Sequence, residues 1–116
     1  MSIVELQRQL ALFRDARDWL QFHSPKNLSA AIAVEAAELQ ELFLWSQTGG
    51  AEVLADRRQA VEDELADVLI QCLNFANATG IDVEAAVRRK IADNGRRYPA
   101  EKARGSAAKW TELDDE

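Results

Sequence analysis

The sequence has few of the residues that interrupt or cross-link a chain. Its 116 residues include one cysteine, two prolines, five glycines and one histidine, and aromatic residues make up 7%. The single cysteine, Cys72, excludes a disulfide within the chain and is typical of a reducing compartment. Because proline and glycine are the main turn signals, their scarcity leaves long segments in which a helix can continue.

The sequence also lacks a basic excess, a long apolar run and a signal-like leader. Its formal net charge of -6 argues against nonspecific binding to a nucleic-acid backbone, which needs a basic surface. No apolar run approaches the ~20 residues of a membrane span, and the N-terminal region carries charge from Glu5 onward. We therefore expect a cytoplasmic protein that binds neither nucleic acid nor membranes. An acidic chain can still bind a phosphorylated small molecule if cations bridge the two.

Helical periodicity fills the segments between the turn signals, and no segment alternates like a strand. Four helices are expected: from about Ile3 to Phe22, from the N-cap Asn27 to about Ser46, from Ala51 or Asp56 to Ala78 before Gly80, and from the N-cap Asp82 to about Arg97. Four helices joined by short loops predict an all-α helical bundle. Residues 1–113 are expected to form one domain, and residues 114–116 a frayed tail. A chain this short buries only a modest fraction of its surface, so oligomerisation is expected.

The informative feature of the second helix is a carboxylate inside its apolar stripe. The stripe consists of Leu28, Ile32, Leu39 and Leu42. Glu35 occupies the gap in this stripe, at a position that the helical period assigns to the core. Glu38 lies on the same face, because residues three apart are neighbours on a helix surface. An ionised carboxylate that faces a bundle interior is costly unless a cation neutralises it.

The third helix repeats this arrangement. Its apolar stripe is flanked by Glu64 and Asp67, again three residues apart. A single Glu-x-x-Glu pair is common on solvated helix faces, whereas acidic pairs on two successive helices indicate a metal site. Oxygen ligands favour a hard cation, and Mg²⁺ is usual where a substrate supplies phosphate oxygens. Iron and manganese sites in bundles normally include a Glu-x-x-His step, which this quartet lacks. The pattern therefore predicts Mg²⁺, with Mn²⁺ as a substitute.

The quartet and the segments around it resemble the MazG-like all-α nucleoside triphosphate pyrophosphohydrolases. Glu-x-x-Glu at 35–38 precedes Glu-x-x-Asp at 64–67, as in this family. The segments 17–28, 41–45, 90–99 and 104–111 are similar to its dCTP pyrophosphatase branch, so the resemblance covers nearly the whole chain. It implies Mg²⁺-dependent hydrolysis of a nucleoside triphosphate to the monophosphate and pyrophosphate. It also implies a homodimer or homotetramer in which paired protomers complete a four-helix core.

The resemblance also implies roles for individual residues. Glu35, Glu38, Glu64 and Asp67 would be the catalytic magnesium ligands, and Glu38 or Glu41 could accept a proton from the attacking water. The residues expected to bind the substrate are Trp19 and Trp45 around the base, His23 near the base or the phosphates, and Lys90, Asn94, Arg97 and Tyr98 at the triphosphate and sugar. Gln71 stands where dCTP-preferring members carry Tyr, which leaves the base preference open.

Two other functions remain open on the sequence alone. The first is hydrolysis of dUTP, of damaged nucleotides or of a broad range of triphosphates on the same scaffold. The second is a helical interaction module whose acidic pairs bind a basic partner. A response to divalent metal distinguishes the interaction module from either enzyme, and product analysis over a panel of nucleotides distinguishes the enzymes from one another.

Overall fold

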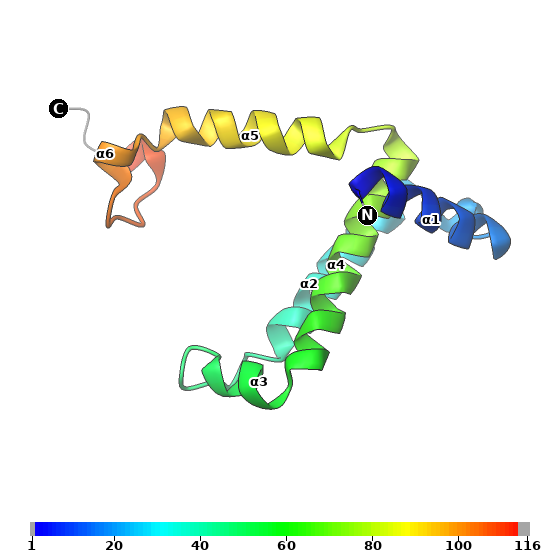
Figure 1. Ribbon diagram of the computed structural model, residues 1–116, viewed down its shortest axis with the longest axis horizontal. Coiled ribbons are helices and arrows are strands. Elements are labelled where there is room, and N and C mark those ends of the chain that lie inside the picture. Colours follow the sequence, from blue (N-terminus) through cyan, green and yellow to red (C-terminus); the bar gives the residue numbers. More distant parts are fainter. Residues whose placement is uncertain (1, 114–116) are drawn as a thin grey trace. The chain divides into compact units, whose positions relative to one another are not determined.

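A computed structural model describes residues 2–113, and every regular element in that range is a helix, which confirms the predicted all-α class (Figure 1). In chain order the elements are α1 (Ile3–Ala16), the 3-10 turn η1 (Leu20–Phe22), α2 (Pro25–Glu41), α3 (Ala51–Asp56), α4 (Arg58–Thr79), α5 (Val83–Arg97), α6 (Ala100–Ala103) and the 3-10 turn η2 (Trp110–Glu112). Four of these helices are long, with 14, 17, 22 and 15 residues. The frayed tail expected at 114–116 lies outside the described residues. No helix among residues 2–113 combines the length and apolar character needed to cross a membrane.

The first helix is shorter than predicted. It ends at Ala16 instead of Phe22, because the backbone turns at Arg17 and enters the left-handed region at Asp18, where φ is 54°. The carbonyl of Arg14 accepts from the backbone N–H of Trp19 at 3.0 Å, which closes the turn. Asp is one of the few non-glycine residues that enter this region readily. The turn therefore forms without the Gly or Pro that a sequence reading looks for.

The second helix begins and ends earlier than predicted. Ser24, and not Asn27, is its N-cap, since the Ser24 Oγ accepts from the Asn27 N–H at 3.1 Å and Pro25 follows at the first helical position. The helix ends at Glu41, and turns replace the predicted continuation to Ser46. Gly50 is the N-cap of α3, with φ of 98°, and a Cβ there would lie 2.8 Å from the Phe43 ring. Only glycine fits this close approach.

Of the two predicted starts of the third helix, Ala51 and Asp56, the later one is close to the observed start of α4 at Arg58. A break at Arg57, with φ of -132° and ψ of 36°, separates α3 from α4. The predicted end holds, because Gly80 adopts φ of 72° and its N–H donates to the Ala76 carbonyl at 2.9 Å. Asp82 caps α5 as expected, with its Oδ1 accepting from the Ala85 N–H at 3.0 Å.

The chain divides into two compact units, residues 1–81 and 82–116, and each is described by itself. In the first unit, α2 and α4 lie side by side and run antiparallel, and α1 crosses the C-terminal half of α4 (Figure 1). Gln7 and Asn77 join α1 to α4 through two hydrogen bonds of 3.0 Å each. The buried apolar side chains of the described residues are few: Leu28, Val53, Leu73 and Ala76. One chain alone therefore has a thin core.

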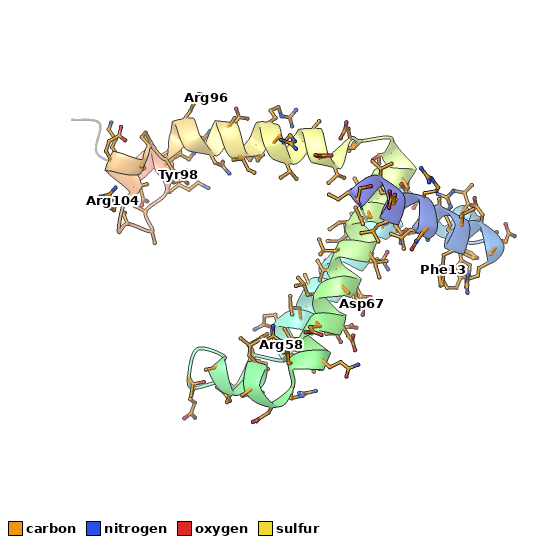
Figure 2. All side chains as sticks on the ribbon, viewed as in Figure 1. Phe13, Arg58, Asp67, Arg96, Tyr98 and Arg104 are labelled. Atoms are coloured by element: carbon orange, nitrogen blue, oxygen red, sulfur yellow. The ribbon has the colours of Figure 1, made fainter. Side chains whose placement is uncertain are left out.

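The second unit is the amphipathic helix α5 followed by a short, folded C-terminal segment. The Tyr98 hydroxyl accepts from the Trp110 backbone N–H at 3.1 Å, and the Arg97 guanidinium lies 5.0 Å from the Trp110 ring centroid. Figure 2 shows the side chains of this unit, with Arg96, Tyr98 and Arg104 labelled. These contacts fold the segment after Pro99 back onto the end of α5.

Candidate active site

Three of the four predicted ligands come together between α2 and α4. One carboxylate oxygen each from Glu35, Glu64 and Asp67 lies within 4.8 Å of the other two, and all three side chains are half-buried. We call these three residues the carboxylate cluster. They meet because α2 and α4 are antiparallel neighbours whose acidic positions face the same seam; Figure 2 labels Asp67 near the middle of α4.

The fourth predicted ligand, Glu38, is exposed at the rim of the cluster. It lies one turn after Glu35, and with Glu41, Arg57 and Glu64 it lines a hollow of about 500 Å³. The carboxyl of Glu38 is close enough to Glu35 and Glu64 to raise the pKa of both. Glu38 therefore belongs to the same electrostatic site although its side chain reaches solvent.

Burial and neighbouring carboxyls raise the pKa of two members of the cluster. Burial raises the pKa of the Glu35 carboxyl, and the neighbouring Glu38, Asp67 and Glu64 raise it further. Burial likewise raises the pKa of Glu64, followed by the effects of Glu38, Asp67 and Asp63. The Oε2 atoms of Glu35 and Glu64 are buried and have no hydrogen-bond partner among residues 2–113.

Unpartnered buried carboxylate oxygens are what a hard divalent cation requires, so the residues present fit a Mg²⁺ or Mn²⁺ site. A cation would neutralise the carboxylates and would supply the missing partners of both Oε2 atoms. Without a cation, protonation is the remaining way to relieve their repulsion.

A cavity of about 310 Å³ lies beside the cluster, between the end of α1, the turn after it and α4. We call it the Trp19 cavity; its lining residues are Leu10, Phe13, Arg14, Trp19, His23, Ile70, Gln71 and Asn74. Three predicted substrate-binding residues, Trp19, His23 and Gln71, thus share one cavity. Gln71 follows Asp67 by four residues, so the cavity lies about one helical turn, roughly 6 Å, from the cluster along α4.

The ring of Trp19 is held in place by neighbours near the end of α1. It packs edge-on against Phe13 with ring centroids 5.7 Å apart. The Arg17 guanidinium lies 3.5 Å above the Phe13 ring and 5.9 Å from the Trp19 ring, and its Nη1 donates to the Phe13 carbonyl at 3.0 Å. The left-handed Asp18 turns the chain so that Trp19 reaches the cavity.

Two polar side chains in the Trp19 cavity, His23 and Asn74, have few hydrogen-bond partners. The Nδ1 of His23 is buried without a partner among the described residues, and burial, followed by the charge of Arg14, lowers the pKa of this imidazole. The buried Asn74 donates from Nδ2 to the Gln71 Oε1 at 3.3 Å. The cavity therefore offers polar atoms to a flat ligand between apolar walls.

The structure does not bring Trp45 to this cavity. Trp45 is 87% exposed and follows α2, whereas Trp19 precedes it. The 17 residues of α2 span about 25 Å. The sequence analysis predicts that both tryptophans lie around one base. In a single chain, Trp19 and Trp45 are too far apart to contact the same ring.

The predicted phosphate and sugar residues lie in the C-terminal unit. Lys90, Asn94 and Arg97 are exposed on α5, and Tyr98 caps its end. Arg97 also lines a hollow of about 290 Å³ with Arg96, Pro99, Lys102, Trp110 and Leu113. Within this unit the structure gives a basic surface that combines three cations and an indole ring.

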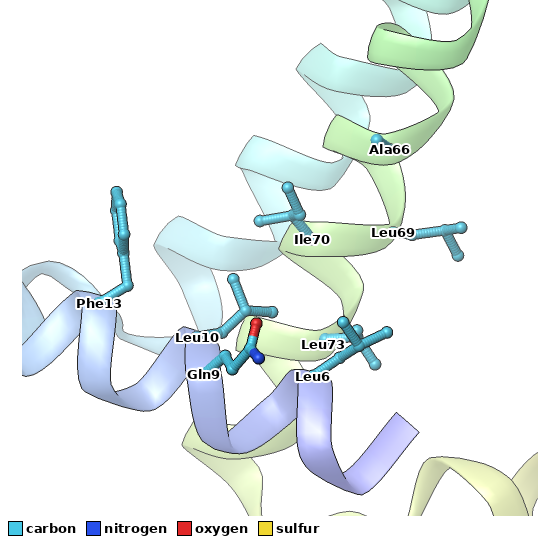
Figure 3. Close-up of a pocket in the computed structure, with 8 residues that line it drawn as sticks. All are labelled: Leu6, Gln9, Leu10, Phe13, Ala66, Leu69, Ile70 and Leu73. Atoms are coloured by element: carbon cyan, nitrogen blue, oxygen red, sulfur yellow. The ribbon is translucent and has the colours of Figure 1, made fainter. Parts of the chain in front are cut away.

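An apolar groove lies between α1 and α4 in the first unit. Its volume is about 460 Å³, and Figure 3 shows its lining residues, Leu6, Gln9, Leu10, Phe13, Ala66, Leu69, Ile70 and Leu73. Gln9 is the one polar side chain among them. The groove offers an apolar surface and no catalytic groups.

Known proteins include relatives of this chain in sequence and in structure. Residues 30–113 match the MazG-like family. The chain belongs to this family. It is 43% identical over 115 residues to dCTP pyrophosphatase 1 of Homo sapiens and 40% identical to that of Bos taurus, covering 97% of this chain and 68% of each relative. A solved pyrophosphatase from Archaeoglobus fulgidus DSM 4304 is similar in structure, with a TM-score of 0.78 and 45% identity over 82% of this chain and 90% of that one. The resemblance to the dCTP pyrophosphatase branch is confirmed.

Sequence reasoning missed two polar residues of this MazG-like chain's cavity, Arg14 and Asn74. On α1, Arg14 looks like an ordinary surface arginine near a helix C-terminus, and Asn74 interrupts the apolar stripe of α4 without a motif. The sequence contains no signal for Arg14. Asn74 could have been predicted to line the cavity from its spacing, because it lies three residues after Gln71 on the same face of the helix.

Proposed function

We propose that this chain hydrolyses dCTP, or a modified pyrimidine deoxynucleoside triphosphate, to the monophosphate and pyrophosphate, with Mg²⁺ as its cofactor and Mn²⁺ as a substitute. Its family, and its similarity to proteins named dCTP pyrophosphatase and pyrophosphatase, make it a nucleoside triphosphate pyrophosphohydrolase. The observation that carries the finer proposal is the carboxylate cluster, whose unpartnered oxygens lie one helical turn from a cavity with an indole wall.

The proposed roles at the cluster follow from its charges. Glu35, Glu64 and Asp67 hold the cations, and Glu38 completes the set from the rim. Magnesium held by these residues would neutralise charge that builds on the phosphate oxygens and would lower the pKa of an attacking water. Glu38 and Glu41, which line the same hollow, are the carboxylates placed to accept the proton of that water.

The proposed nucleoside site is the Trp19 cavity. Trp19 stacks on the base, an interaction worth ~1–3 kcal/mol, and His23 and Gln71 form hydrogen bonds with the nucleoside. Because Trp45 is exposed and lies a helix length from Trp19 of its own chain, we assign it to the cavity of a second copy. The proposed contacts of Lys90, Asn94, Arg97 and Tyr98 are to the triphosphate and sugar. The protein would then act as a homodimer or homotetramer in the cytoplasm, on free nucleotides and without nucleic acid.

A panel of dCTP, dUTP, dTTP, dATP and dGTP tests the reaction and its substrate. We expect a nucleoside monophosphate and pyrophosphate from dCTP, because cations held by the carboxylate cluster would stabilise the charge of pyrophosphate as the leaving group. Chromatography of the products beside a phosphate-release assay measures this.

Orthophosphate as the first product would overturn the proposed reaction. A preference for dUTP or for a purine would leave the reaction intact and would replace the proposed substrate. A chain that neither hydrolyses any nucleotide nor responds to Mg²⁺ would instead fit a helical interaction module.

A further inference from the structure

The Trp19 cavity contains one charged group, and it belongs to a residue with no role so far. Among the lining residues, Arg14 alone carries a charge at neutral pH, since burial and Arg14 itself keep the pKa of His23 below its usual value. The Arg14 side chain is only 15% exposed although arginine usually reaches solvent. The side chain pairs with Asp15 through Nε, and its other donors are available to a ligand in the cavity.

One hydrogen bond orients the Arg14 guanidinium. Its Nε donates to the Asp15 Oδ1 at 2.9 Å. Within residues 2–113 the structure gives Nη1 and Nη2 no acceptor, so the two terminal nitrogens form a fork of unused donors. The carbonyl of the same residue accepts from the Trp19 N–H at 3.0 Å. Arg14 is thereby tied to the ring that would stack on a base.

The other polar groups of the cavity discriminate less between bases. The Gln71 amide both donates and accepts, so it can meet either a carbonyl or an amino group. Asn74 already uses its Nδ2 in a hydrogen bond to Gln71. Arginine has no acceptor, so it requires acceptors on the ligand and rejects a donor at the same place.

Among pyrimidines, cytosine alone has two adjacent acceptors on its pairing edge, N3 and O2. In uracil and thymine N3 carries a hydrogen, which would oppose the guanidinium donors. Arginine reads the adjacent O6 and N7 acceptors of guanine through the same two-pronged contact. A fork beside a stacking ring thus selects cytosine over uracil.

We propose that Arg14 is the residue that determines base specificity, and that its Nη1 and Nη2 donate to N3 and O2 of a cytosine stacked on Trp19. This assignment rests on the proposed function for the placement of the base in the cavity. It adds the group that distinguishes dCTP from dUTP.

The test compares Arg14→Met, which keeps most of the apolar stem, Arg14→Lys, which keeps the charge without the fork, and the control Arg8→Met. Arg8 is exposed on the same helix and lines none of the described hollows. We expect Arg14→Met to lower the preference for dCTP over dUTP by about ten-fold to a hundred-fold. The change should come from KM for dCTP with kcat nearly unchanged. Arg14→Lys should recover only part of the preference, and Arg8→Met should match the wild type.

A binding measurement separates this inference from the proposed reaction. Calorimetric titration with dCMP and dUMP requires no hydrolysis, and Arg14→Met should weaken dCMP binding by about ten-fold or more while dUMP binding changes little. Wild type that releases no pyrophosphate but shows this pattern would overturn the reaction and keep the role of Arg14. The role of Arg14 would be overturned if the ratio of dCMP to dUMP affinity is unchanged in a folded Arg14→Met variant. It would also be overturned if the variant loses affinity for both nucleotides equally, which indicates a phosphate contact, or if the wild type prefers uracil.

Discussion

Glu64→Gln should reduce kcat for dCTP by about a thousand-fold or more, with the helices intact. The amide removes one negative charge and one anionic ligand from a cluster whose oxygens lie within 4.8 Å of each other. Metal ions contribute several kcal/mol to the stabilisation of charge in such reactions, and each 1.36 kcal/mol is a factor of ten in rate. Steady-state kinetics at saturating Mg²⁺ measures the loss. Glu35→Gln should behave in the same way.

In the absence of metal, Glu64→Gln should be as stable as the wild type or more stable, although its kcat falls. Burial and like-charged neighbours raise the pKa of Glu64 in the folded chain, so a neutral side chain there removes repulsion. Mg²⁺ should raise the melting temperature of the wild type and have little effect on Glu64→Gln, since a ligand stabilises the state that binds it. Glu62→Gln is the matched control, because Glu62 is exposed on the same helix and pairs only with Arg58 at the surface. Near-full activity of Glu64→Gln would contradict the metal-site assignment.

Light scattering should give the protein a mass of two or four times the 13.0 kDa of one chain. Apolar side chains at the α1–α4 groove and beside it remain open in the single chain, with Leu6 40%, Phe13 48%, Leu65 49% and Leu69 54% exposed. Exposed apolar patches that are contiguous usually mark interfaces, and a two-fold dimer covers the same patch on both copies. Leu69→Lys, which places a charge on α4 at this groove (Figure 3), should shift the mass to that of one chain at micromolar concentration.

Leu12→Lys is the control for this substitution. Leu12 is 64% exposed on α1 but does not line the groove, so its replacement should leave the assembly unchanged. If the dimer also brings Trp45 to the partner's cavity, Leu69→Lys should lose activity together with the assembly. A wild type that elutes with the mass of one chain would refute the expected oligomer.

The sequence was most informative where a local rule acts alone. Asp82 and Gly80 mark the start and end of helices through a side-chain cap and a left-handed glycine, and both were predicted correctly. Glu35 drew attention because it interrupts an apolar period, and the structure brings it to Glu64 and Asp67.

The misses have a common physical cause, which is tertiary context. The turn at Asp18 uses residues without a strong stop signal, so the predicted first helix continued through it. The break at Arg57 has no strong signal either, which left two predicted starts, Ala51 and Asp56, for the third helix. Arg14 could not be distinguished from a surface arginine, because its burial depends on how α1 crosses α4. The exposure of Trp45 follows from the end of α2 at Glu41, five residues earlier than predicted.

The most direct test of the metal centre is to locate Mn²⁺ in crystals of the protein by anomalous scattering. Mn²⁺ takes the same oxygen ligands as Mg²⁺ and scatters anomalously, so its position can be determined independently of the protein atoms. We predict an anomalous peak bounded by the carboxylates of Glu35, Glu64 and Asp67, and its absence in Glu64→Gln crystals treated in the same way. A carboxylate cluster without a peak, at a Mn²⁺ concentration that supports turnover, would contradict the account.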